Sequence, residues 1–236
     1  MKKKKIHQGQ VIGTGEKVFN IGMAILGILI SLVVLYPIYY VLIASLSQPY
    51  YVESGDVMFA VKHFTLASYR EAVKKSGIWL AYGNTIFYTV AGVAVNMLFT
   101  TTMAYALSKK KLVFRKFFTL FTIFTMWFNA GIIPMYLTFK DFSLLNTRTA
   151  IVLGFAINTY NLIIMKSFFE QLPEALEEAD FIDGANHIIT FFKIYLPLSK
   201  PALATVGLFY AINRWNSYFW AMPLLNDASK DTPKVL

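Results

Sequence analysis

The sequence has no cysteine and few charged residues, and each shortage excludes a class of protein. Only 15% of the 236 residues are charged, compared with roughly 25% in soluble domains. Hydrophobic residues make up 56%, and the mean hydropathy is +0.52. This composition indicates an integral membrane protein whose length fits one bundle of helices. Without cysteine, the chain cannot form disulfides, thiolate metal sites or a cysteine nucleophile.

Other residues that carry chemistry are also scarce. The three histidines, His7, His63 and His187, lie far apart and outside the apolar runs, which argues against a haem or zinc site made by this chain alone. No apolar run holds a pair of carboxylates, which disfavours a proton-relay pump or an intramembrane aspartyl protease. We therefore predict that the chain is not an enzyme and has no catalytic residue and no metal site.

Five apolar runs predict membrane spans. The first is far longer than the apolar region of a signal peptide, which has about 7–15 residues, and Pro37 is expected to kink it. The third is interrupted near Gly131 and Pro134, and the fourth is short. A short surface helix is expected over 66–75, in the polar stretch before the second span. The spans are predicted at about 19–45, 84–107, 117–139, 149–165 and 202–221.

Basic residues predict the orientation in the membrane. The net charge of +9 is typical of basic loops on the inner side, so we expect no nucleic-acid partner. The two richest basic clusters, Lys2–Lys5 and Lys109–Lys116, are separated by two spans and therefore share one side, the cytoplasm. Residues 1–18 then form a cytoplasmic N-terminal segment, and the loop 170–198, which follows four spans, is cytoplasmic too.

The stretch from Leu172 to Leu198 is a long polar segment between two strongly apolar ones. Its apolar residues recur at steps of three and four, the spacing of one helix face. Pro173 suits the first turn of a helix, Gly184 interrupts the helix, and Pro197 closes the segment. We predict a short amphipathic helix, a flexible point and a lead-in to the last span. Such a helix outside the bilayer needs a surface on which to dock.

Polar side chains inside the predicted spans indicate a substrate path. An arginine at the bilayer centre costs about 2.5–3.5 kcal/mol on insertion scales, so Arg214 is expected to face a water-filled cavity or a charge partner rather than snorkel. Amide, guanidinium and indole groups together suit ligands rich in hydroxyls. For any single asparagine, a hydrogen bond between helices is the favoured alternative. The candidates are Trp127, Asn129, Asn158, Asn161, Arg214, Trp215 and Asn216.

Motifs in the 172–198 segment resemble the EAA loop of ABC-importer permeases. Gly184, Ile194 and Leu196-Pro197 fall at the family spacing, whereas Glu178-Ala179-Asp180 replaces the strict triplet. Other segments are similar to the carbohydrate-importer branch, the maltose-type permeases, and to its sub-branch for complex oligosaccharides and polygalacturonan. They are Asn84-Thr85, Ala104–Ser108, Ile133–Tyr136, Leu144–Thr147, Phe209–Ala211 and Arg214–Ser217.

The resemblance implies an all-α integral membrane protein in the plasma membrane of a bacterium. Residues 19–236 would form a polytopic helix bundle of the type I ABC-importer permease kind with a cytoplasmic coupling helix, although the sixth span normal in the family is missing after residue 221. The residues implied to couple the chain to an ATPase are Glu174, Ala175, Glu178, Ala179, Asp183, Gly184, Ala185, Leu196 and Pro197.

The resemblance also implies the partners. They are a second homologous permease subunit, two ATPase subunits, an extracytoplasmic sugar-binding protein, the lipid bilayer and an imported oligosaccharide. ATP and Mg²⁺ would bind the ATPase subunits, because this chain has no glycine-rich phosphate-binding loop and needs no cofactor of its own. Two alternatives stay open: a permease for a non-sugar solute, which should lack the aromatic and amide lining, and a membrane anchor or enzyme subunit.

Overall fold

The computed structural model describes residues 14–128 and 130–225, and throughout these ranges the chain forms helices, turns and loops without strands. This confirms the predicted all-α class. The chain divides into two compact units at Lys75 and Ser76, and each unit is described by itself.

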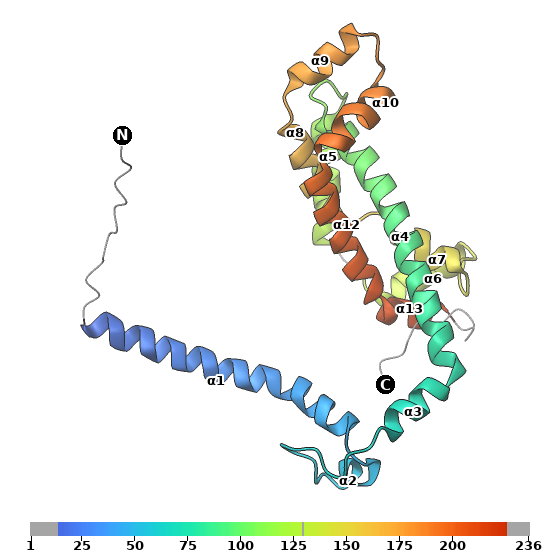
Figure 1. Ribbon diagram of the computed structural model, residues 1–236. Helices are drawn as coiled ribbons and strands as arrows, with labels where there is room; N and C mark the ends of the chain where they lie inside the picture. The colour runs from blue at the N-terminus through green and yellow to red at the C-terminus, as the bar shows by residue number, and fades with distance from the viewer. Residues whose placement is uncertain (1–13, 129, 226–236) are drawn as a thin grey trace. The chain divides into compact units, whose positions relative to one another are not determined.

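The first unit contains one long apolar helix. α1 runs from Thr14 to Ser45 and includes Pro37 (Figure 1). Its apolar side chains from Val18 to Tyr39 are exposed all around, whereas Ile43 near its end is buried. Such a surface is stable only when lipid or another chain covers it. Two short helices follow, α2 (Pro49–Glu53) and α3 (Ala67–Lys74). α3 confirms the surface helix expected over 66–75.

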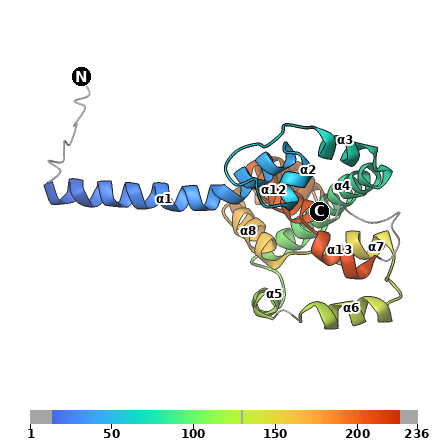
Figure 2. The ribbon, with the colours of Figure 1, turned by 90° about the horizontal axis from the view of Figure 1, so that it is seen from below.

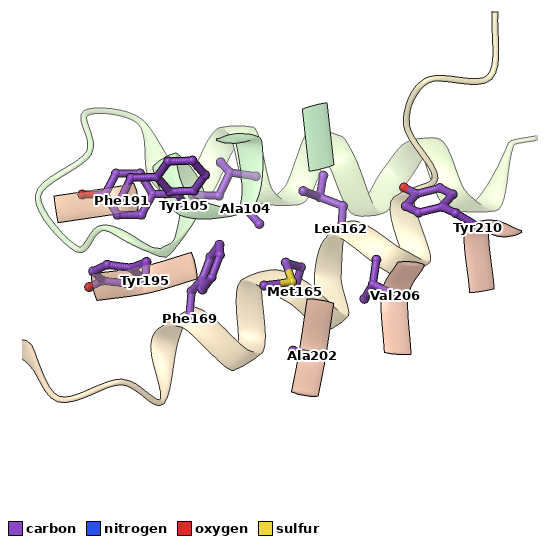
Figure 3. Close-up of a cluster of buried hydrophobic side chains, with 11 residues drawn as sticks. Ala104, Tyr105, Leu162, Met165, Phe169, Phe191, Tyr195, Ala202, Val206 and Tyr210 are labelled. Atoms are coloured by element: carbon purple, nitrogen blue, oxygen red, sulfur yellow. The ribbon is translucent and has the colours of Figure 1, made fainter. Parts of the chain in front are cut away.

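The second unit is built along α4, which runs from Ser76 to Ser108. α8 (Thr159–Glu170) and α12 (Lys200–Trp215) pack along it (Figures 1 and 2). The core between these three helices is apolar, as Figure 3 shows, and its buried residues include Ala104, Leu162, Met165, Ala202 and Val206.

Shorter helices pack at the end of this unit where α4 begins. They are α6 (Ile132–Asp141), α7 (Arg148–Leu153) and α13 (Tyr218–Leu224). Their buried apolar residues surround Tyr88 of α4. The backbone N–H of Asn146 donates to the carbonyl of Leu224 at 2.8 Å, which joins the loop before α7 to the end of α13.

Two helices among the described residues are long and apolar enough to cross a membrane, Gly15–Ser45 and Gly77–Ser108. α5 (Arg115–Trp127) and α6 form a third, bent candidate. They meet at 119°, and Gly131, with φ +81°, lies at the break that the sequence predicted. The helix of the second predicted span, α4, begins at Ser76 and not near residue 84, so Trp79 and Tyr82 lie within it.

The fourth and fifth predicted spans are not continuous helices either. The span expected over 149–165 is interrupted, because α7 ends at Leu153 and α8 begins at Thr159. The Asn158 side chain accepts the backbone N–H of Asn161 and so starts α8 as a new helix. The span expected over 202–221 ends at Trp215, where α12 gives way to α13.

The polar segment 172–198 lies at the opposite end, where α4 ends (Figure 1). It contains α9 (Glu174–Ile182), α10 (His187–Thr190), the π-helical turn η1 (Phe191–Tyr195) and α11 (Leu196–Leu198). The predicted helix is confirmed, but Gly184 is part of a defined turn rather than a flexible point. With φ +85° at Gly184, the N–H groups of Gly184 and Ala185 donate to the carbonyls of Phe181 and Asp180, which is a Schellman motif.

Candidate functional site

The two faces of α9 differ in what they carry. Glu177 and Asp180 are three residues apart, so they share one face; the Glu177 side chain is 14% exposed and that of Asp180 is 3% exposed. Ile182 is 85% exposed and Leu176 is exposed as well, and Ile188 of the following helix α10 is also exposed. Buried acidic residues therefore fix the helix to its own chain, and its exposed apolar residues are free to contact another one.

Glu177 is the centre of the contact between α9 and α4. Lys109, the residue after α4, places its Nζ 2.7 Å from Glu177 Oε2. The hydroxyl of Tyr195 donates to the same oxygen at 2.9 Å. The Lys109 ammonium also lies over two rings, 3.9 Å from the centroid of Tyr105 and 3.7 Å from that of Tyr195. We call these four residues the Lys109 clamp.

Burial and charge perturb the titration of the clamp. Burial lowers the pKa of Lys109, and its hydrogen bond and ion pair with Glu177 oppose that shift. Burial also raises the pKa of Tyr195, and the carboxylate of Glu177 raises it further. The tyrosine hydroxyl therefore stays protonated at neutral pH and is a donor to Glu177.

Asp180 closes the turn between α9 and α10. The Thr190 hydroxyl donates to its Oδ2 at 2.6 Å, and Lys193 Nζ lies 3.1 Å from its Oδ1. The hydrogen bond from Thr190, followed by that from Lys193, holds the pKa of Asp180 below its ordinary value of 3.8. The carboxylate is thus ionised at neutral pH and joins α9, α10 and η1.

Further ion pairs connect the basic loop after α4 with α8 and α9. Lys110 and Glu174 are 2.6 Å apart but 75% and 61% exposed, so water screens the pair. Glu170 pairs with Lys166 at 2.7 Å and with Arg115. A cavity of about 200 Å³ between the loop and α9 is lined by side chains of both charges. The basic cluster predicted to face the cytoplasm is therefore largely paired with acidic residues of the same chain.

The predicted coupling residues lie mostly at the surface of this segment, and their role stays a prediction. Ala185 and Leu196 are partly buried, whereas the others are exposed: Glu174, Ala175, Glu178, Ala179, Asp183, Gly184 and Pro197. Sequence reasoning missed Glu177, Asp180, Tyr105, Lys109 and Tyr195 as a connected group. The three-residue spacing of Glu177 and Asp180 was the one available signal, since it places both acids on one helix face.

Arg214 lies inside the helix bundle and is 3% exposed. Its Nε and Nη2 lie 3.2 and 2.6 Å from Asn96 Oδ1. Nη2 also donates to the carbonyls of Val152 and Phe155, at 3.0 and 2.9 Å, and Nη1 donates to the carbonyl of Ile151. The expectation of a water-filled cavity or a charge partner is wrong for the part of the chain that the structure describes, because the acceptors there are one amide and three backbone carbonyls.

These contacts place Arg214 at the break between α7 and α8. Asn96 also donates through Nδ2 to the Phe155 carbonyl at 3.0 Å. Gly92 of α4 leaves room for the guanidinium, because a Cβ there would lie 2.7 Å from Arg214 Nε. Side chains from α4 and α12 thus supply hydrogen bonds where the helix is interrupted. We call Arg214, Asn96 and the three carbonyls the Arg214 cluster.

The other predicted path residues do not form one group. The N–H of Asn158 donates to the Tyr210 hydroxyl at 3.1 Å, and Asn161 is buried beside it. Asn216 donates to the carbonyl of Ile212 at 2.9 Å within its own helix. Trp127 is 81% exposed and Trp215 is also exposed. Asn129 lies outside the described residues. Contact of these residues with a substrate stays a prediction.

These features define a polytopic membrane protein. The described residues form only helices and loops, and two of the helices are long enough to cross a membrane. Other apolar helices are broken, and a charged amphipathic segment lies at one end. Within this class, the chain belongs to the family of binding-protein-dependent transport system inner membrane components, whose profile matches residues 77–228. This confirms the resemblance to ABC-importer permeases.

Individual relatives cover most of the chain. It is 40% identical over 216 residues to the polygalacturonan/rhamnogalacturonan transport system permease protein YtcP of Bacillus subtilis (strain 168), covering 91% of this chain and 76% of that protein. Protein LplC of the same organism is 40% identical, covering 85% and 68%. A solved structure of a bacterial ABC transporter involved in the import of the acidic polysaccharide alginate contains a chain that matches with a TM-score of 0.86 and 42% identity, covering 92% of this chain and 78% of that one.

Proposed function

We propose that this chain is a transmembrane permease subunit of an ATP-driven importer that moves oligosaccharides into the cytoplasm of a bacterium. The similarity at 40% identity to a polygalacturonan/rhamnogalacturonan permease, over 91% of the chain, carries the proposal. The alginate importer chain, at 42% identity, supports it. Both names describe polysaccharides, which favours a sugar over an amino acid, a phosphate or a metal ion.

The α9–α10 segment is the proposed contact with the ATPase. It carries exposed apolar side chains at Leu176, Ile182 and Ile188 beside the exposed acid Glu178. Exposed apolar groups next to charges are typical of a surface that a partner covers. ATP would bind and be hydrolysed on separate ATPase subunits. The N-terminus and this segment would face the cytoplasm, as the basic clusters predict.

The remaining partners follow from the family's description as a binding-protein-dependent system. They would be a second permease subunit and an extracytoplasmic sugar-binding protein. Asn158 and Asn161 at the break between α7 and α8, with the exposed Trp215 and Asn216, are the proposed path lining on this subunit. Arg214 would support this lining without contacting the substrate. Its N–H groups donate to protein acceptors and so stabilise the break between α7 and α8.

Reconstitution tests the proposal. The chain would be co-expressed with its partner permease, ATPase and binding protein, and the complex placed in proteoliposomes. We expect oligogalacturonides or alginate oligosaccharides to stimulate ATP hydrolysis and to be taken up only with ATP, while amino acids and phosphate do neither. Failure of the ATPase to co-purify with the chain would refute the importer assignment. Uptake of only a non-sugar solute would refute the substrate class.

A further inference from the structure

We infer that the Lys109 clamp makes α9 and the end of α4 one mechanical unit, so that a displacement of α9 moves α4 with it. Lys109 and Glu177 are then positioning residues for transport rather than contacts to substrate or ATPase. This inference rests on the proposed function, in which α9 is the segment that an ATPase subunit displaces.

The clamp gathers three separate segments on one carboxylate oxygen. Lys109 comes from the end of α4, Glu177 from α9 and Tyr195 from η1. Lys109 and Glu177 are 68 positions apart in the sequence. Because Oε2 of Glu177 accepts from both partners, a shift of α9 against α4 would strain its contacts with Lys109 and with Tyr195 together.

The surroundings of Lys109 make the clamp stiff. Its ammonium lies against the rings of both Tyr105 and Tyr195. The centroids of the two rings are 4.8 Å apart, and the ring planes are nearly perpendicular, at 78°. Both tyrosines belong to the buried aromatic end of the core, with Phe169 and Phe191, which Figure 3 shows at the end opposite Tyr210. The side chains of Lys109 and Glu177 are only 16% and 14% exposed. Separating them would deprive two poorly hydrated charges of their ion pair, which is strongly unfavourable.

A second ion pair between the same two segments provides a matched control. Lys110 is the next residue in the loop, and Glu174 lies one turn before Glu177 on α9. Their Nζ–Oε1 distance is 2.6 Å, similar to that in the clamp, but the side chains are 75% and 61% exposed. An exposed pair contributes little and exchanges readily with water. Only the clamp is expected to transmit force.

The experiment compares the clamp with the adjacent Lys110 in the complete reconstituted transporter. Lys109→Met and Glu177→Gln would be measured beside Lys110→Met, with ATP hydrolysis and sugar uptake followed in the same vesicles. We expect the clamp variants to hydrolyse ATP while importing at least roughly 5-fold less sugar per ATP, since allosteric couplings span about 5- to 150-fold. Lys110→Met removes only the exposed pair and should keep the wild-type ratio.

Rescue separates transmission from mere stability. Lys109→Arg keeps a cation that can stack on an aromatic ring and donate to Glu177, so it should restore most of the uptake per ATP. If Lys109→Met fails to assemble, the comparison of Glu177→Gln with Lys109→Arg decides the question. Equal uptake per ATP in the clamp and control variants would overturn the inference.

A distance measurement tests the clamp independently of transport. The chain has no cysteine, so two can be introduced for spin labels, at Ile182 of α9 and Leu98 of α4, both exposed. In the wild-type complex the distance between the labels should stay narrowly distributed with and without ATP, and Glu177→Gln should broaden it. An unchanged distribution in Glu177→Gln would refute the clamp. A wild-type complex that imports no sugar would instead refute the proposed function while leaving this measurement valid.

Discussion

Replacing Arg214 by methionine is expected to loosen the break between α7 and α8. The substitution removes the donors to Asn96 Oδ1 and to the carbonyls of Ile151, Val152 and Phe155. The Phe155 carbonyl keeps the amide of Asn96 as a donor. Three acceptors therefore lose the arginine, and a buried acceptor left unsatisfied costs about 1–3 kcal/mol.

Two effects reduce the total. Methionine avoids the cost of burying a cation, which amounts to several kcal/mol for a buried ion, and its side chain fills part of the space. We therefore expect a net loss of about 2–4 kcal/mol for the local structure, within the range of a broken buried network. Lysine should not substitute for Arg214, because an ammonium cannot reproduce the planar fork that reaches Asn96 and the carbonyls together.

Hydrogen exchange in the purified complex measures this loss where it occurs. A local loss of about 2–4 kcal/mol should speed the exchange of amides in 148–161 by roughly 30-fold or more. Unchanged exchange in that segment, together with an unchanged thermal midpoint, would refute the role given to Arg214.

Two glycines provide a second test of the same cluster. Gly92→Ala places a Cβ 2.7 Å from Arg214 Nε and should speed exchange in the same segment. Gly207→Ala is the matched control, since its nearest neighbour is Met97 Sδ at 3.9 Å. The control should leave the segment unchanged, or stabilise α12 by up to about 1 kcal/mol through helix propensity.

Three further predictions concern single side chains. The pKa of Asp180 is lower in the folded protein than in the unfolded chain, where it is near 3.8. The carboxylate therefore stabilises the fold above the unfolded pKa, and this stabilisation is lost as the pH falls through the folded-state pKa. Asp180→Asn should flatten the acid part of a plot of thermal midpoint against pH. Gly184→Ala forces an L side chain into φ +85° at a cost of about 1–2 kcal/mol and should lower sugar uptake per ATP, whereas Gly77→Ala, with open space around it, should not. Asn158→Ala removes the cap of α8 and should cost about 1 kcal/mol in thermal unfolding, whereas the exposed Asn216→Ala should be nearly silent.

The features that the sequence predicted are those decided by neighbouring residues. The apolar helices α1 and α4 follow from composition, because a long apolar run with few or no charges predicts a membrane helix. The breaks at Gly131 and Gly184 follow from the one residue type that adopts positive φ without strain. α9 follows from the spacing of its apolar residues, which also placed them correctly on a face that the chain itself leaves uncovered.

The features that the sequence did not predict depend on residues far apart in the chain. An apolar run over 149–165 looks continuous, because the hydrogen bonds that permit its break come from Arg214 and Asn96, more than fifty positions away. Lys109 likewise looks like one member of a basic cluster, and only its neighbours in space distinguish it from Lys110. Composition and spacing carry no information on which of two adjacent lysines lies against aromatic rings.

Helices α4 and α12, which pack side by side, connect the Lys109 clamp with the Arg214 cluster. Lys109 follows the last residue of α4, and Asn96 lies about 20 Å back along that helix at ~1.5 Å per residue. α12 runs unbroken from Lys200 to Trp215 beside α4 and carries Arg214 near its end. The apolar core between the two helices is closely packed, and packed interfaces move as bodies rather than bend. A displacement of α9 passed to α4 by the clamp would therefore reach the break between α7 and α8 as a shift of whole helices. The break would respond there because side chains of α4 and α12 donate hydrogen bonds to its carbonyls.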